Sequence, residues 1–99
     1  MDKTFYNQYI KGPRWAAKRE AWFNAFGKYC RACGTAHGPI QLHHMTYDRL
    51  GRERMSDLVA LCANCHKEVE ILYRRAGGMD RMLITLTFIK ARKRNRGRR

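Results

Sequence analysis

Residues 58–76 read LVALCANCHKEVEILYRRA, a stretch that joins an apolar run, a Cys-x-x-Cys pair and an amphipathic repeat. The run Leu58–Leu61 is typical of a short buried strand. Apolar side chains then recur with the i, i+3, i+4, i+7 spacing of a helix, at Val69, Leu72, Tyr73 and Ala76. Two glycines follow and end this helix. The sequence therefore predicts a strand that passes into a helix over residues 63–76, with two cysteines and a histidine at the junction.

Another cysteine pair, Cys30 and Cys33, lies upstream, and 28 residues separate Cys33 from Cys62. Two short-spaced pairs are typical of a closed structural zinc site with four thiolate ligands, here Cys30, Cys33, Cys62 and Cys65. Zinc would pin the turn around residue 30 against the end of the second strand. Folding should then depend on the metal.

The cysteines allow three other interpretations. Two disulfides would suit a secreted miniprotein, but residues 1–9 lack the apolar segment of a secretion signal, so we expect reduced thiols in the cytoplasm. Residues 62–66 match the c-type haem pattern Cys-x-x-Cys-His, against which the second pair and the missing export signal argue. A redox dithiol would not explain two matched pairs. Zinc accounts for the four cysteines best.

Between the two pairs, Ile40–Met45 alternates as a short strand would, and a charged loop follows over residues 47–56. We expect this strand to pair with Leu58–Leu61 as an antiparallel hairpin. His43 and His44 lie on the first strand, and His66 directly follows the last cysteine. The hairpin and the helix should bring the three imidazoles together beside the zinc site. The simpler alternative is that His66 caps its helix and the other two decorate an exposed strand.

The flanking segments complete one small domain over residues 1–89, with its core at about residues 40–76. Pro13 predicts the start of a helix that runs to Phe26 with an apolar stripe at Trp15, Trp22 and Phe26. The segment after Asp80 alternates like a strand but also fits a helix, which we favour because it continues into residues 90–93. We expect residues 90–99 to form a basic extension whose last residues, 95–99, are mobile.

Charge and length restrict the class of function. The 99 residues hold 21 Lys and Arg against 8 Asp and Glu, a formal charge of +13, which predicts a polyanionic partner. Seven of the basic residues lie in residues 90–99, so the rest of the chain still carries +6. The longest uncharged apolar run, residues 82–89, is too short for a membrane span of about 20 residues. We therefore expect no membrane association.

The combination of motifs resembles the HNH endonuclease family in its small, zinc-bound phage and bacterial form. The matching segments run from about Tyr6 to Glu70: a basic helix with tryptophan, Cys30-x2-Cys33, Leu42-His43-His44, Thr46-Tyr47, Gly51, Asp57-Leu58 and Leu61-Cys62-x2-Cys65-His66. The resemblance implies an α+β fold of the ββα-metal type, in which a hairpin and a helix hold one catalytic divalent ion. It also implies a bacterial host or a phage-infected cell as the setting.

The resemblance assigns roles to individual residues. His44 corresponds to the general base, and His43 and His66 to ligands of the catalytic ion. Asp57 occupies the central position of the motif, where the family has asparagine, and would either bind the metal or pin the loop that carries the base. Asn64 lies within the zinc knuckle and is expected to be a turn residue instead.

The implied activity is that of a metal-dependent DNA endonuclease or nickase that hydrolyses phosphodiester bonds. An imidazole at position 43 favours Mn, Ni, Co or Zn relative to Mg. We expect mainly backbone contacts with DNA, through Arg14, Lys18, Arg49, Arg52, Arg54, Lys67, Arg74 and Arg75. The alternative is a non-catalytic zinc module that binds nucleic acid or a phage or bacterial protein, such as a packaging or restriction partner.

Strand geometry raises one difficulty for this assignment. Neighbouring residues of a regular strand face opposite ways, so His43 and His44 cannot both face one ion unless the chain bends there. Glu53 and Asp48 are further candidate carboxylates in the charged loop.

Overall fold

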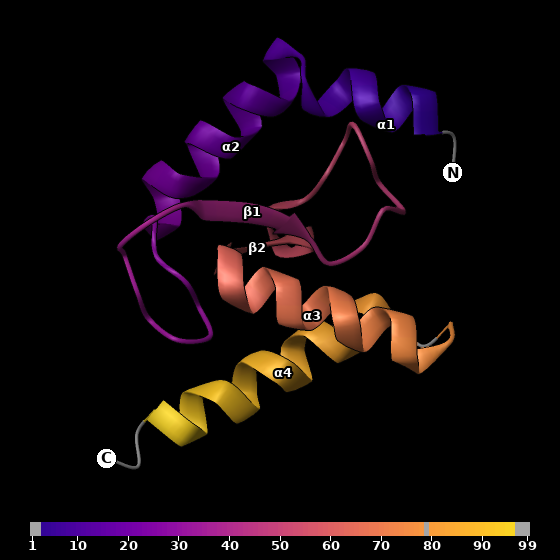
Figure 1. The fold of residues 1–99 in the computed structure, drawn as a ribbon. Coiled ribbons are helices and arrows are strands. Elements are labelled where there is room, and N and C mark those ends of the chain that lie inside the picture. Colours follow the sequence, from indigo (N-terminus) through magenta and orange to yellow (C-terminus); the bar gives the residue numbers. More distant parts are fainter. Residues whose placement is uncertain (1–2, 79, 97–99) are drawn as a thin grey trace.

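The computed structural model describes residues 3–78 and 80–96, which form a small mixed α/β fold with four α-helices and a two-stranded sheet (Figure 1). The elements are α1 (Lys3–Ile10), α2 (Pro13–Phe26), β1 (Ile40–His44), a 3-10 turn (Met55–Asp57), β2 (Leu58–Cys62), α3 (Ala63–Ala76) and α4 (Arg81–Arg96). Within this part of the chain, no helix combines the length and the apolar character needed to cross a lipid bilayer.

The predicted hairpin is confirmed. β1 and β2 pair antiparallel, with Ile40 opposite Cys62 and His44 opposite Leu58. Figure 1 shows α1 and α2 on one side of the sheet and α3 and α4 on the other. Every residue of β2 is buried, as expected for a strand covered on both faces. The sheet is therefore the centre of the molecule, and each face of β1 meets a different pair of helices.

The helix α2 has the predicted bounds. Pro13 occupies its first turn, and Gly27, with φ of +91°, ends it through a bond from its N–H to the carbonyl of Phe23. Trp15 and Trp22 are buried, as the apolar stripe predicted. Phe26 was expected in the same stripe but is 48% exposed: it is the last residue of the helix, and its ring lies 4.9 Å from that of Trp22.

The helix α3 also has the predicted bounds and begins directly after β2. Cys62 is its N-cap, and the sulfur of this residue accepts a hydrogen bond from the backbone N–H of Cys65 at 3.4 Å. Val69 is fully buried against the core. The helix ends at Gly77, whose φ of +58° is left-handed. The junction of sheet and helix is thus fixed by a cysteine.

The segment after Asp80 is a helix, which decides between the two patterns that the sequence allowed. The Asp80 carboxylate accepts a hydrogen bond from the N–H of Met82 at 2.8 Å, and Thr85 and Ile89 are buried. The helix continues to Arg96, so residues 90–96 of the expected basic extension are helical. The mobile end was expected over residues 95–99: residues 95 and 96 belong to this helix, and residues 97–99 lie outside the described residues.

The first helix, α1, was not predicted. It has only eight residues, too few for a clear periodic pattern, and its single buried side chain is Tyr9. The Tyr9 ring lies 5.9 Å from that of Trp15, and its hydroxyl donates a hydrogen bond to Glu53 at 2.7 Å. Tertiary contacts therefore hold α1 in place, rather than its local sequence.

Candidate metal centres and a neighbouring cleft

The four cysteines form one cluster. Their sulfurs lie within 4.8 Å of one another, with 3.7 Å between Cys33 and Cys62. A tetrahedral zinc site with Zn–S bonds of about 2.3 Å would place its sulfurs about 3.8 Å apart. A disulfide would need about 2.05 Å between sulfurs, and all four cysteines are free. The cluster could therefore hold a structural metal such as zinc.

The electrostatics of the cluster also favour a cation. Burial opposes ionisation of Cys30, yet N–H groups of the backbone around it, including that of Cys33, lower the pKa of this thiol to about 6. Burial and the neighbouring thiols raise the pKa of Cys33 and of Cys65. Several thiolates crowded together are stable only beside a positive ion, and a divalent metal would supply that charge.

A second group of candidate ligands lies between β1 and α3. It consists of His43, His66 and Glu70, whose ligand atoms all lie within 4.8 Å of one another. The Nε2 of His66 is 3.5 Å from a carboxylate oxygen of Glu70, and the rings of His43 and His66 are 5.0 Å apart. We call these three residues the His–His–Glu group. Two imidazoles and a carboxylate are a donor set that suits several divalent transition metals.

Glu70 was not predicted as a ligand, although the sequence contains the signal. It follows His66 by four residues in α3, so both side chains lie on one face of the helix. An acidic residue at this spacing is common in surface helices, and only the position of His43 on the neighbouring strand marks this one.

The imidazoles of the His–His–Glu group are in the form that metals bind. Burial lowers the pKa of His43 to about 3, and the nearby His66 and Arg81 add to this effect. Burial also lowers the pKa of His66, although Glu70 acts in the opposite direction. Both rings are therefore neutral at pH 7, and no proton has to leave before a metal binds.

His44 lies on the opposite face of β1, among aromatic rings of the N-terminal half. Its Nε2 is 2.7 Å from one carboxylate oxygen of Glu53, and the hydroxyl of Tyr9 donates to the other at 2.7 Å. These two hydrogen bonds outweigh burial and lower the pKa of Glu53. An ionised carboxylate only accepts hydrogen bonds, so Nε2 of His44 is the donor in this pair, and the neutral imidazole then has its lone pair on Nδ1. The imidazole ring stacks on Trp15, at 4.6 Å, and on Tyr47, at 5.4 Å.

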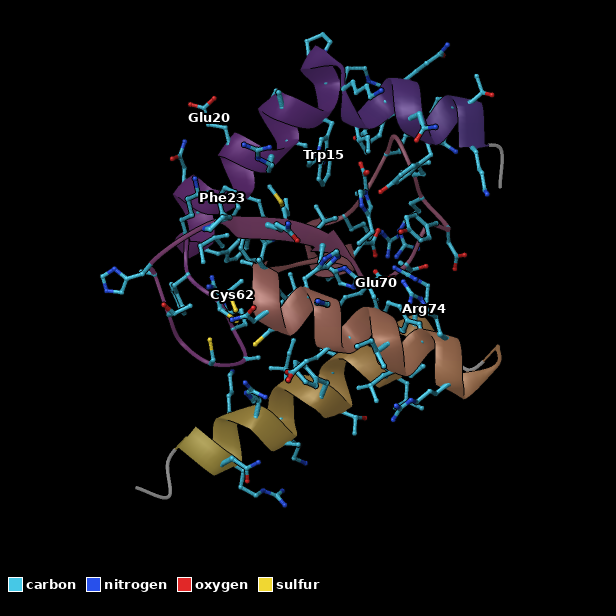
Figure 2. All side chains as sticks on the ribbon, viewed as in Figure 1. Trp15, Glu20, Phe23, Cys62, Glu70 and Arg74 are labelled. Carbon is cyan, nitrogen blue, oxygen red and sulfur yellow. The ribbon has the colours of Figure 1, made fainter. Side chains whose placement is uncertain are left out.

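The alternation of β1 resolves the difficulty posed by the adjacent histidines. The strand stays regular, so His43 joins the His–His–Glu group while His44 faces the other way. The two sides nevertheless share a cleft of about 400 Å³ between the N-terminal helices and β1, which both His44 and His66 line. Figure 2 shows Trp15 directed from α2 toward the sheet above this region, and Glu70 on the side of α3 nearest the hairpin loop.

Asp57 has the contacts of a residue that pins the hairpin loop. Its carboxylate accepts two hydrogen bonds from the guanidinium of Arg49, one of them at 2.8 Å, and a third from the N–H of Arg54 at 3.0 Å. The Arg49 bonds hold the pKa of this carboxyl below its usual range. Asp57 is fully buried and belongs to neither group of candidate ligands found in residues 3–78 and 80–96. Of the two roles that the sequence allowed, these contacts match loop pinning.

The predicted DNA-binding residues fall into two sets. Arg14 donates to the carbonyl of Gly51 at 2.5 Å and Lys18 to that of Glu53 at 2.9 Å, so these two side chains fasten α2 to the hairpin loop, as Arg49 fastens Asp57. Gly51 has a φ of +90°, which favours glycine at this contact. The second set comprises exposed residues that are open to a phosphate backbone: Arg52, Arg54, Lys67, Arg74 and Arg75.

Comparisons with known proteins add no relative. No family model matches the chain, and no similar curated protein or solved structure was found.

Proposed function

We propose that this protein is a metal-dependent DNA endonuclease or nickase with a ββα-metal fold of the HNH type. The observation that carries the proposal is the placement of two different groups on the two faces of β1. The His44–Glu53 pair lies on one face and the His–His–Glu group on the other, and His44 and His66 line one cleft. A base, and a metal site that reaches the same cleft through one of its ligands, are the parts that phosphodiester hydrolysis requires.

His44 is the general base in this scheme. Its Nδ1 takes a proton from the attacking water, while Nε2 remains bonded to Glu53. The Glu53 carboxylate fixes the tautomer and stabilises the imidazolium that forms, and stacking against Trp15 holds the ring in orientation.

His43, His66 and Glu70 would hold the catalytic ion. When bound, a divalent metal at this group supplies a Lewis acid for the scissile phosphate and for the leaving oxygen. Two imidazoles in the donor set favour Mn, Ni, Co or Zn over Mg. The four-cysteine cluster would hold a structural zinc that takes no part in the reaction.

DNA is the proposed substrate, because the formal charge of +13 favours a polyanion. The exposed arginines and lysines of the hairpin loop and α3 would contact the phosphate backbone. The cytoplasm of a bacterial or phage-infected cell is the proposed setting, with packaging or restriction proteins as candidate partners.

A plasmid-nicking assay over a panel of divalent metals tests the function. We expect His44→Ala to lower the cleavage rate by about 10²- to 10⁴-fold, the usual contribution of a general base. His37→Ala is the matched control, because His37 is exposed and lies outside both groups of candidate ligands. A thermal melt shows whether each variant is folded.

Undiminished cleavage by folded His44→Ala would remove the assigned base. If none of the metals in the panel supports cleavage by the wild-type protein, and the protein still binds DNA, the chain is the alternative zinc module rather than an enzyme.

A further inference from the structure

Arg81, the first residue of α4, lies beside the His–His–Glu group although it comes from outside the hairpin and α3. Its guanidinium lies between two aromatic rings, 4.5 Å from the centre of Tyr47 and 4.1 Å from that of Tyr73. One nitrogen, Nη2, donates to the backbone carbonyl of His44 and to the hydroxyl of Tyr47, each at 3.2 Å. These contacts fix the cation at one place relative to β1 and α3.

The same cation faces the candidate metal ligands. Nη2 of Arg81 lies 4.0 Å from a carboxylate oxygen of Glu70. The Tyr73 ring that stacks on Arg81 reaches His43, with 2.6 Å between the Tyr73 hydroxyl and Nε2 of the histidine. The Nε of Arg81 is buried and has no hydrogen-bond partner among the described residues, and the side chain is 28% exposed. Arg81 therefore adjoins the group, and its only ion pair among the described residues is the long 4.0 Å contact with Glu70.

We propose that Arg81 is a catalytic residue, whose guanidinium keeps a positive charge beside the His–His–Glu group and binds the substrate phosphate there. This inference rests on the proposed function and extends it to α4. Glu70 has one negative charge, and a metal ion takes its carboxylate as a ligand. The Arg81 charge then remains free to attract a phosphodiester, which is an anion.

This arrangement has a consequence for metal binding alone. A fixed cation and a divalent ion repel each other, so Arg81 weakens the affinity of the group for its metal. If Arg81 served only to hold the helices together, its loss would loosen the ligands and weaken metal binding. The sign of the change in metal affinity therefore separates the two roles.

Calorimetric titration of the full, zinc-loaded chain with Mn²⁺ measures that sign. We expect Arg81→Gln to bind Mn²⁺ about 3- to 10-fold more tightly than wild type, and Arg81→Lys, which retains the charge, to stay within about twofold. Arg94→Gln is the matched control, because Arg94 is exposed on the same helix, about 20 Å farther along it. Glu70→Gln should weaken the binding, which shows that the titrated site is the His–His–Glu group.

Cleavage at saturating Mn²⁺ supplies the second measurement. We expect kcat/KM to fall at least about 10-fold in Arg81→Gln and less in Arg81→Lys. The inference would be overturned, and the proposed function left intact, by either of two results. One is weaker Mn²⁺ binding by folded Arg81→Gln; the other is an affinity change in Arg81→Lys as large as that expected for Arg81→Gln. Both the inference and the proposed function would be overturned if the wild type does not bind Mn²⁺, or if Glu70→Gln leaves Mn²⁺ binding unchanged.

Discussion

His43 and His44 are neighbours in the chain, but their surroundings share little. His43 lies against α3 beside two other candidate ligands, whereas His44 is bonded to a carboxylate from the hairpin loop and stacked on a tryptophan of α2. Both side chains are 4% exposed. The regular alternation of one short strand thus places a candidate metal ligand and the proposed general base on two sides of a single backbone segment.

Glu53 is the residue whose substitution best tests the orientation of His44. Glu53→Gln keeps an oxygen that accepts the Nε2 proton but removes the negative charge that stabilises an imidazolium. We expect kcat for DNA cleavage to fall at least about 10-fold with little change in KM. Steady-state nicking kinetics measure both. Glu68→Gln is the control, since Glu68 is exposed and pairs only with Arg92 at 2.9 Å among the described contacts; an equal loss in the two variants would contradict the role of Glu53.

At this scale the sequence predicted the histidines but not all of their partners. The cysteine spacing and the position of each histidine follow from local patterns, and period-two alternation required opposite faces for residues 43 and 44. Glu70 and Arg81 lie close to His43 only because α3 and α4 pack together beneath β1, and no local pattern encodes that packing. Glu53 was one of two loop carboxylates, and its burial beneath α1 distinguishes it from Asp48.

Asp57 fastens the hairpin loop through its hydrogen bonds with Arg49 and with the backbone of Arg54. Asp57→Asn removes the charge that holds Arg49, so we expect a loss of about 1.5–3 kcal/mol in the free energy of unfolding at pH 7, measured by urea denaturation. Asp48→Asn, an exposed change in the same loop, should have little effect. Equal stability of Asp57→Asn and wild type would refute the pinning role.

The difference in unfolding free energy between wild type and Asp57→Asn depends on pH with a defined sign. Arg49 lowers the pKa of Asp57 in the folded state, so the stabilisation is fully present above the unfolded value of about 3.9 and is lost as the pH falls through the folded value. The difference between the two proteins should therefore stay constant from pH 8 to about 5.5.

Helix bounds were predictable where a local signal marked both ends. Proline and glycine delimit α2, and a cysteine knuckle and two glycines delimit α3. The helix α1 is stabilised by contacts that Tyr9 makes with distant residues, and its short sequence has no such marks. The segment of α4 fits both periods, so only its packing, with Thr85 and Ile89 inward, decides the matter.

Across the whole molecule, the four-cysteine cluster joins the segment before β1 to the start of α3. Structural zinc contributes about 10–16 kcal/mol in small domains, which is as large as the total stability of a typical protein. We therefore expect Cys62→Ser to lose zinc and to unfold rather than merely to lose activity. Circular dichroism and a zinc assay measure this, with Asn64→Ala as the control because Asn64 is exposed within the same knuckle. A folded, zinc-loaded Cys62→Ser protein would contradict a structural zinc.

Cys62 ends β2, caps α3 and belongs to the thiol cluster, and His66 and Glu70 follow it within two turns of the same helix. If the cluster holds zinc and the His–His–Glu group the proposed catalytic ion, the two sites would be assembled in sequence: the sulfur-bound ion would orient the helix, and only then could the imidazoles and the carboxylate converge. Zinc scarcity would consequently limit how much of this protein exists in folded form, whatever the supply of the second metal. The cell's zinc supply would thus set the amount of active protein.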